Sequence, residues 1–176
     1  MSVRLLAISG SLRAVSTNSA LLQAAALLAP AGVEIEFWQR LSTLPHFNPD
    51  DDVDPLPPAV VDWRAKVAAA DGLVISSPEY ARGIPGSLKN ALDWLVSGPE
   101  HPGKAVAFLH ASERGVASQA ALRLVLETMG TRIVDSACIT INLLGTEKDA
   151  ATVADNPAYA AKITGALNAF AEAIAG

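Results

Sequence analysis

Short apolar runs alternate with longer amphipathic stretches along the chain. The runs are rich in branched or aromatic residues, and several are apolar on both faces, as strands are in a parallel sheet covered on both sides. They predict strands at Val3–Ile8, Val33–Trp38, Leu73–Ser76, Ala105–His110 and Ile133–Ile141. The stretches between them predict helices near Asn18–Leu28, Pro58–Ala70, Gly86–Ser97, Val116–Met129 and Pro157–Ala175.

Strands that alternate with helices predict βαβ units, and five such units fit 176 residues. Right-handed crossovers then place helices on both faces of one parallel sheet, which makes the fold class α/β. Ligands of such sheets bind beyond the carboxyl ends of the strands, where the strand order reverses. We therefore look for chemistry directly after Ile8, Ser76 and His110.

Two segments interrupt the alternation. Arg40–Pro57 holds several prolines and aspartates, so it cannot form regular helix or a central strand, and we expect a surface loop near the rim of the active site. Gly145–Asn156 is read as a second irregular stretch, without an assigned role.

Composition and charge narrow the class of protein. With 51% apolar and 18% charged residues the chain reads as one globular domain, and its net charge of −5 without a basic patch speaks against a nucleic-acid partner. Cys138 alone cannot form an internal disulfide, and we interpret it as a buried filler within the last strand. His46, His101 and His110 are too scattered for a metal site. Without a leader or a long apolar run, we expect a cytoplasmic protein that does not bind membranes.

The segment after the first strand has the features of a phosphate-binding loop. Hydroxyl and amide side chains recur in it, at Ser11, Ser16, Thr17 and Asn18. Arg13 adds a planar guanidinium that matches phosphate oxygens, and the following helix offers free N–H groups at its start. Gly10 allows a sharp backbone turn. Any of the three polar residues near the helix start could instead be a plain N-cap, but that reading explains neither Arg13 nor Ser11.

The segment after the third strand suits a flat ring. Pro78, Gly83, Pro85 and Gly86 restrict its backbone, which can present N–H and C=O groups to the edge of a heterocycle. Tyr80 can pack near such a ring. The hydroxyl-rich loop after the first strand and this loop after the third strand together favour FMN, which has a terminal phosphate, over a ligand that has a pyrophosphate.

Three motifs resemble the NADPH-dependent FMN reductase family, over most of the chain to about residue 130. They are Ile8-Ser9-Gly10-Ser11-Leu12-Arg13 with Ser16-x-Asn18, Leu44-Pro45-x-Phe47-Asn48-Pro49-Asp50, and Pro78-Glu79-Tyr80 with Gly83-x-Pro85-Gly86-x-Leu88-Lys89-Asn90-Ala91-Leu92-Asp93-Trp94. The resemblance implies a flavodoxin-like three-layer sandwich over residues 1–176, with a five-stranded parallel sheet in the order 2-1-3-4-5.

The resemblance also implies site residues. The FMN phosphate is assigned to Ser11, Arg13, Ser16 and Asn18, beside which Thr17 offers a further hydroxyl. The ring is assigned to Pro78, Glu79, Tyr80, the backbone at Ala81 and Gly83, and Ser112 after the fourth strand. We expect Glu79 to fix loop geometry, and we name no catalytic residue, because the cofactor carries the chemistry.

The sequence departs from the family pattern at two places. Ala81 stands where an Asn usually follows the Pro-Glu-Tyr triplet. The segment His110–Gln119 is shorter than its counterpart, and in it Arg114 replaces a glycine.

We therefore predict an FMN-dependent oxidoreductase that passes hydride from NADPH or NADH to a small acceptor such as a quinone, free flavin, metal oxyanion or azo compound. An FMN-binding electron carrier and a non-enzymatic flavodoxin-like module are the alternatives. The resemblance, together with an apolar patch expected around an outward-pointing Trp94, predicts a homodimer or a dimer of dimers.

Overall fold

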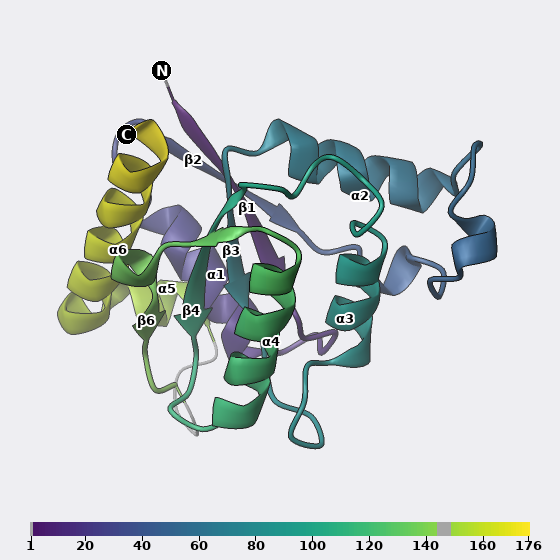
Figure 1. Ribbon diagram of the computed structural model, residues 1–176. Helices are drawn as coiled ribbons and strands as arrows, with labels where there is room; N and C mark the ends of the chain where they lie inside the picture. The colour runs from purple at the N-terminus through teal and green to yellow at the C-terminus, as the bar shows by residue number, and fades with distance from the viewer. Residues whose placement is uncertain (1, 144–148) are drawn as a thin grey trace.

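The computed structural model describes residues 2–143 and 149–176 and confirms the alternation of strands and helices (Figure 1). The strands are β1 (Val3–Ser9), β2 (Val33–Trp38), β3 (Gly72–Ser76), β4 (Ala105–His110), β5 (Arg132–Ile133) and β6 (Ile139–Thr140). The helices are α1 (Thr17–Leu27), α2 (Pro58–Ala69), α3 (Gly86–Asp93), α4 (Val116–Thr128), α5 (Ala150–Asp155) and α6 (Pro157–Ala175). The predicted bounds agree within one residue, except in α3, which ends before Ser97, and in the last strand.

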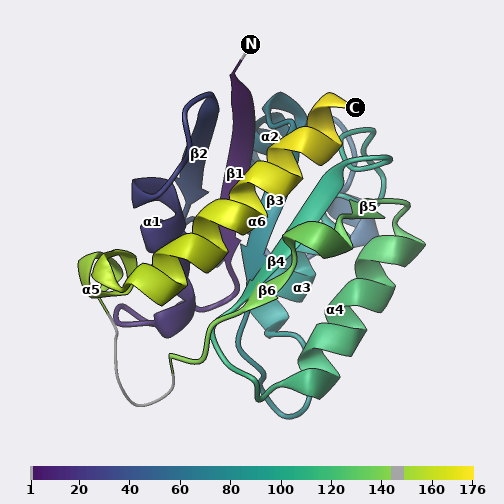
Figure 2. The ribbon, with the colours of Figure 1, turned by 90° about the vertical axis from the view of Figure 1, so that its left-hand side faces the viewer.

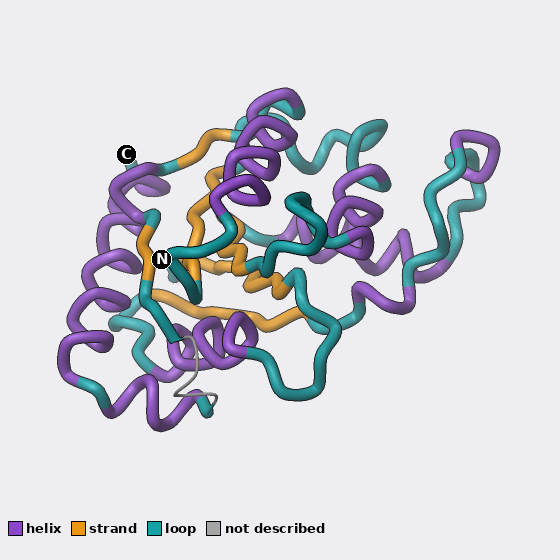
Figure 3. The backbone as a smooth tube through the Cα atoms, turned by 90° about the horizontal axis from the view of Figure 1, so that it is seen from below, coloured by secondary structure: helices purple, strands orange, loops and turns teal. Residues whose placement is uncertain are grey.

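The sheet is parallel, with the order β2-β1-β3-β4-β5 that the flavodoxin-like fold predicts. One row of its register joins Trp38, Ile8, Ile75 and Phe108 across four strands, at the last residue of β2 and one or two residues before the other three strands end. Because all strands point the same way, the loops that follow them meet at one edge of the sheet, the edge that Figure 3 views from below. The strand order reverses between β1 and β3, which is where a ligand is expected.

Helices cover both faces of the sheet (Figure 2). On one face, α1, α5 and α6 enclose a core that includes Leu21, Val153 and Phe170. On the other face, α2, α3 and α4 enclose a second core that includes Trp63, Leu92 and Leu122. The strands are therefore buried on both sides, which explains why their sequences read as continuous apolar runs.

The prediction of one strand at Ile133–Ile141 is wrong, because a 3₁₀ turn at Asp135–Ala137 divides it into β5 and β6. Both pieces pair with β4, one near its start and one at its end. Cys138 lies between the pieces and not within a strand, and it is half-buried. Its Sγ accepts a hydrogen bond from the backbone N–H of Phe108 at 3.4 Å, so the thiol replaces the carbonyl that a continuous strand would have offered.

The segment Arg40–Pro57 contains two short 3₁₀ helices, Leu41–Thr43 and Pro49–Asp51, and projects from the body of the protein beside α2 and α3 (Figures 1 and 3). Its attachment to α3 uses the Asn90 side chain, which accepts from Phe47 N at 2.7 Å and donates to the Pro45 carbonyl at 2.9 Å. Trp94 Nε1 donates to the same carbonyl at 2.8 Å, and its ring meets Phe47 edge-on. Trp94 is fully buried by this contact, so the expected outward patch around it does not exist.

A second attachment of this segment is a largely buried ion pair. Arg64 Nη2 lies 2.9 Å from Asp52 Oδ1, and the two side chains are 13% and 10% exposed. Arg64 also donates to the Trp94 carbonyl and to Ser97 Oγ. Because each charge has a partner, the segment is held in one position although it is mostly irregular.

The prediction of an irregular stretch at Gly145–Asn156 is wrong where the structure describes it, since residues 150–155 form α5, capped by the Asp149 carboxylate. The remainder of that prediction, up to residue 148, lies outside the described residues. Among the helices that the structure describes, none is both long and apolar enough to cross a bilayer.

Candidate functional site

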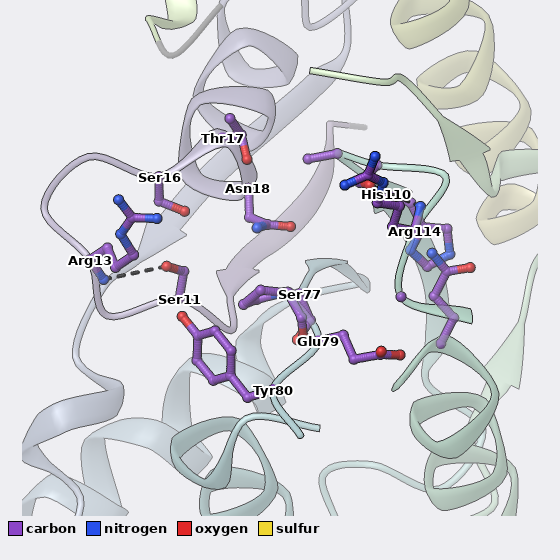
Figure 4. Close-up of a pocket in the computed structure, with 15 residues that line it drawn as sticks. Ser11, Arg13, Ser16, Thr17, Asn18, Ser77, Glu79, Tyr80, His110 and Arg114 are labelled. Atoms are coloured by element: carbon purple, nitrogen blue, oxygen red, sulfur yellow. Dashed lines mark hydrogen bonds between the residues drawn. The ribbon is translucent and has the colours of Figure 1, made fainter. Parts of the chain in front are cut away.

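The loops after β1, β3 and β4 surround a pocket of about 340 Å³, within the roughly 300–1,000 Å³ typical of small-molecule sites (Figure 4). Nearly all the predicted site residues line it, namely Ser11, Arg13, Ser16, Thr17, Asn18, Pro78, Glu79, Tyr80 and Ser112. Ala81 and Gly83 do not. Of the segment Arg40–Pro57, only Leu41 and Ser42 come near, in a smaller hollow beside the first loop, so most of that segment is away from this pocket.

The first loop is shaped by its own hydroxyl groups. Ser16 is the N-cap of α1, and its Oγ accepts from Ser19 N at 3.4 Å. Ser11 Oγ accepts from Arg13 N at 3.3 Å, which bends the loop around the pocket (Figure 4). Asn18 Oδ1 accepts from the buried hydroxyl of Ser76 at 3.0 Å, so Asn18 joins the helix to the end of β3 and is not the cap. The backbone N–H groups of Thr17 and Asn18, two residues that line the pocket, have no acceptor among the described residues.

Gly10 has a role other than the sharp turn that we expected. Its φ is not in the left-handed region. A Cβ at this position would lie 2.4 Å from Ser77 Oγ and 3.1 Å from the side chain of Leu88. The missing side chain therefore lets the first and second loops approach each other closely.

The second loop contains a tight two-residue hairpin. Tyr80 and Gly83 exchange two backbone hydrogen bonds, at 3.1 and 2.9 Å. Ala81 and Arg82, at its tip, have φ of 49° and 60°, which is a turn that favours Gly and Asn. An Asn at position 81 thus suits the backbone itself, and Ala81 holds the same turn with some strain.

Glu79 ties the second loop to the helix after β4. Its Oε2 accepts from Ser118 N at 2.9 Å, near the start of α4, where Gly115 offers no side-chain cap. Ser118 Oγ donates in return to the Pro78 carbonyl at 3.3 Å. The expectation that Glu79 fixes loop geometry agrees with these contacts. The partner was not foreseeable, because it lies 39 residues further along the chain.

Several pocket residues were not among those predicted, and most come from the end of β4 and the segment that follows it: His110, Ala111, Arg114, Gly115 and Gln119. The signal for them was the rule that ligands lie beyond strand ends, which singled out the position after His110. Burial, and secondarily the Arg123 guanidinium, lower the pKa of His110 to about 4, so its imidazole is neutral at ordinary pH. Ser77, from the second loop, was also missed.

The charges of the pocket suit an anionic ligand with a polar ring. Arg13 and Arg114 line it, and within the described residues neither guanidinium has an ion-pair or hydrogen-bond partner. The acid among the lining residues, Glu79, has one oxygen engaged by α4. The hydroxyls of Ser16 and Thr17 and the open start of α1 add phosphate donors beside Arg13. The donor set therefore fits FMN.

Comparisons with known proteins point the same way. A profile of the NADPH-dependent FMN reductase family matches residues 3–143. An NAD(P)H-dependent FMN reductase of Pseudomonas aeruginosa is 46% identical over 112 residues, which are 62% of this chain and 60% of that protein. A quinone reductase of Escherichia coli is 37% identical over 110 residues, which are 61% and 58% of the two chains. The matched region thus spans about half to three-fifths of the length of the curated relatives.

A solved structure extends the likeness to nearly the whole chain. The flavoenzyme NAD(P)H:(acceptor) oxidoreductase FerB of Paracoccus denitrificans superposes with a TM-score of 0.76 at 25% identity, over 98% of this chain and 97% of that one. The family match covers all three loops of the pocket and the helices that follow them. This chain belongs to the NADPH-dependent FMN reductase family.

Proposed function

We propose that this protein is an FMN-dependent NAD(P)H oxidoreductase that delivers reducing equivalents to a small acceptor. The observation that carries the proposal is the meeting, in one pocket, of a cationic hydroxyl-rich loop and a rigid loop shaped for a ring. The names of the relatives, FMN reductase and quinone reductase, support it and favour quinones or free flavin as acceptors.

In the proposed complex, each loop has a separate task. Arg13, Ser16 and Thr17, together with the open N–H groups of α1, hold the phosphate, and Ser11 and Asn18 keep that loop in place. Pro78, Glu79 and Tyr80 line the ring, and the hairpin at Ala81 and Gly83 holds Tyr80 at the mouth of the pocket. Ser112 closes the opposite side.

Bound FMN would supply the capacity to accept and release hydride, so the protein needs to position reactants more than to supply acids or bases. Two titratable residues of the pocket are consistent with a positioning role of the protein. The Glu79 carboxylate is engaged as a helix cap, and His110 is neutral at ordinary pH. We therefore assign no residue to proton transfer, and we propose that the dinucleotide and the acceptor use the open side of the pocket in turn.

Further parts of the proposal concern the whole protein. We propose that residues 1–176 act as a single FMN-binding domain in the cytoplasm. Tyr80 at the pocket mouth is 49% exposed, and Leu12 and Val15 nearby in the first loop are both 57% exposed, which supports assembly as a homodimer or a dimer of dimers around the site. An FMN-binding electron carrier is the second candidate, but an arginine beside an open-sided pocket favours the enzyme.

One experiment separates these functions. The purified protein is titrated with FMN, and NADPH is then added without oxygen while the absorbance of oxidised flavin is followed near 450 nm (an approximate cofactor property). Bleaching supports the oxidoreductase, binding without bleaching leaves the carrier, and absence of binding refutes both. Addition of a quinone should restore the absorbance.

A variant tests the placement of the phosphate. Arg13→Ala should weaken FMN binding tenfold or more, about the value of one charge-assisted contact, and leave riboflavin binding nearly unchanged. Arg4→Ala is the matched control, because Arg4 lies near the start of β1, at the opposite end of that strand from the loop that carries Arg13, and is paired with Asp71. Equal losses for FMN and riboflavin would show that Arg13 does not bind the phosphate.

A further inference from the structure

The pocket has a positive charge at each end. Figure 4 shows Arg13 on one side and Arg114 on the other, with Asn18 and Ser77 between them. Each arginine precedes a helix that begins at the pocket, α1 for Arg13 and α4 for Arg114. On charge alone, the phosphate of FMN could enter at either end.

The two helix starts are not equivalent, however. The start of α4 already holds an anion of the chain itself, because the Glu79 carboxylate accepts from Ser118 N at 2.9 Å. A phosphate placed there would meet that carboxylate at close range, which is unfavourable. The start of α1 has only the neutral Ser16 hydroxyl as its cap. The phosphate therefore belongs at the α1 end, and the ring extends toward Arg114.

Arg114 is held by its backbone, while its charge remains available. Its N–H donates to Ser112 Oγ at 2.9 Å, and the next residue, Gly115, has a φ of 95°. A Cβ on Gly115 would lie 3.3 Å from the Cβ of Glu79, so the turn is packed against the second loop. The guanidinium itself has no partner among the described residues. Because Arg114 lines the pocket, its unpaired charge is available to a ligand bound there.

We propose that Arg114 sets the redox preference of the site by binding the reduced form of the flavin ring more tightly than the oxidised form. The inference rests on the proposed function. Reduction adds negative charge to the ring, so a facing guanidinium favours the reduced form, whereas the nearby Glu79 carboxylate opposes it. The phosphate has the same charge in both forms, so Arg13 contributes equally to both. Arg114 therefore raises the midpoint potential of the bound FMN, whereas Arg13 contributes only to the affinity for FMN.

The test is the midpoint potential of the FMN-loaded protein, measured by equilibration with a reference dye, in four variants. Arg114→Gln removes the charge at similar length and should weaken binding of reduced FMN about tenfold more than binding of oxidised FMN. For a two-electron couple a tenfold change corresponds to about 30 mV, so the potential should fall by that amount. Arg114→Lys keeps the charge and should stay near the native value. Glu79→Gln keeps an acceptor for Ser118 but removes the negative charge, so it should raise the potential.

Arg13→Ala is the matched control, because it removes an arginine from the same pocket. It should weaken the binding of both redox forms equally and leave the potential unchanged. A potential in Arg114→Gln equal to the native value overturns the inference, as does an equal fall in Arg114→Gln and Arg13→Ala. Failure of the native protein to bind FMN refutes the proposed function as well, so the two failures are distinguishable.

Discussion

Acidification should destabilise this protein through His110. Burial at the end of β4, and secondarily the Arg123 guanidinium, lower the pKa of His110 from 6.5 to about 4. The folded state therefore binds a proton less readily than the unfolded chain, and stability that is fully present above pH 6.5 is lost as the pH falls toward 4. With 1.36 kcal/mol for each pKa unit, the loss is about 1 kcal/mol near pH 5.5 and about 3 kcal/mol near pH 4.

The assay is urea unfolding of the native protein and of His110→Asn at a series of pH values between about 7.5 and 4. Asn cannot take up the proton, so the native protein should lose about 3 kcal/mol more than the variant over this range. His46→Asn is the matched control, since the His46 side chain is exposed, and it should follow the native curve. If the native protein and His110→Asn lose stability in parallel, the imidazole is not held in its neutral form by the fold, and the reasoning is wrong.

Three other substitutions, two of them paired with a comparison variant, test the loops by chemical denaturation. Glu79→Ala removes the cap of α4 and should cost about 0.5–2 kcal/mol, while Glu79→Gln should keep most of it; similar losses in both would argue against capping. Ala81→Gly relieves a left-handed backbone and should add about 1 kcal/mol, so a less stable variant would contradict the strain. Gly10→Ala should cost about 1–3 kcal/mol because its Cβ meets Ser77, whereas Gly86→Ala, whose Cβ meets nothing within 4 Å, should be neutral; equal effects would refute the close approach.

The position of the Arg40–Pro57 segment illustrates how a motif acquires its meaning from packing. In the sequence, Asn90 and Trp94 belong to one of the motifs that resemble the family, and Trp94 is expected to point outward onto a partner surface. In the structure they bind the Pro45 carbonyl and the Phe47 backbone, so they hold the projecting segment against α3. A helix with an apolar side chain pointing away from the sheet does not by itself reveal whether that side chain meets another subunit or another part of the same chain.

Local features of this protein were determined by the sequence alone. The spacing of the apolar residues predicted the bounds of β1 to β4 and of most helices to within one residue, because strands and helices each have a characteristic spacing. The proposed phosphate loop was also recognisable, since Arg13, Ser16 and the start of α1 are neighbours along the chain. The parallel order of the strands then followed from the family resemblance and was confirmed.

Only the tertiary structure decided which distant groups meet. Cys138 completes a sheet that Asp135–Ala137 interrupts, Glu79 caps a helix 39 residues further on, and Arg114 stands across the pocket from Arg13. Each of these contacts joins segments that no local pattern links, because it depends on how the loops pack after the strands have assembled. The proposed phosphate end of the site lies within one continuous segment and could be predicted from the sequence, whereas the proposed ring end is built from two loops and required the fold.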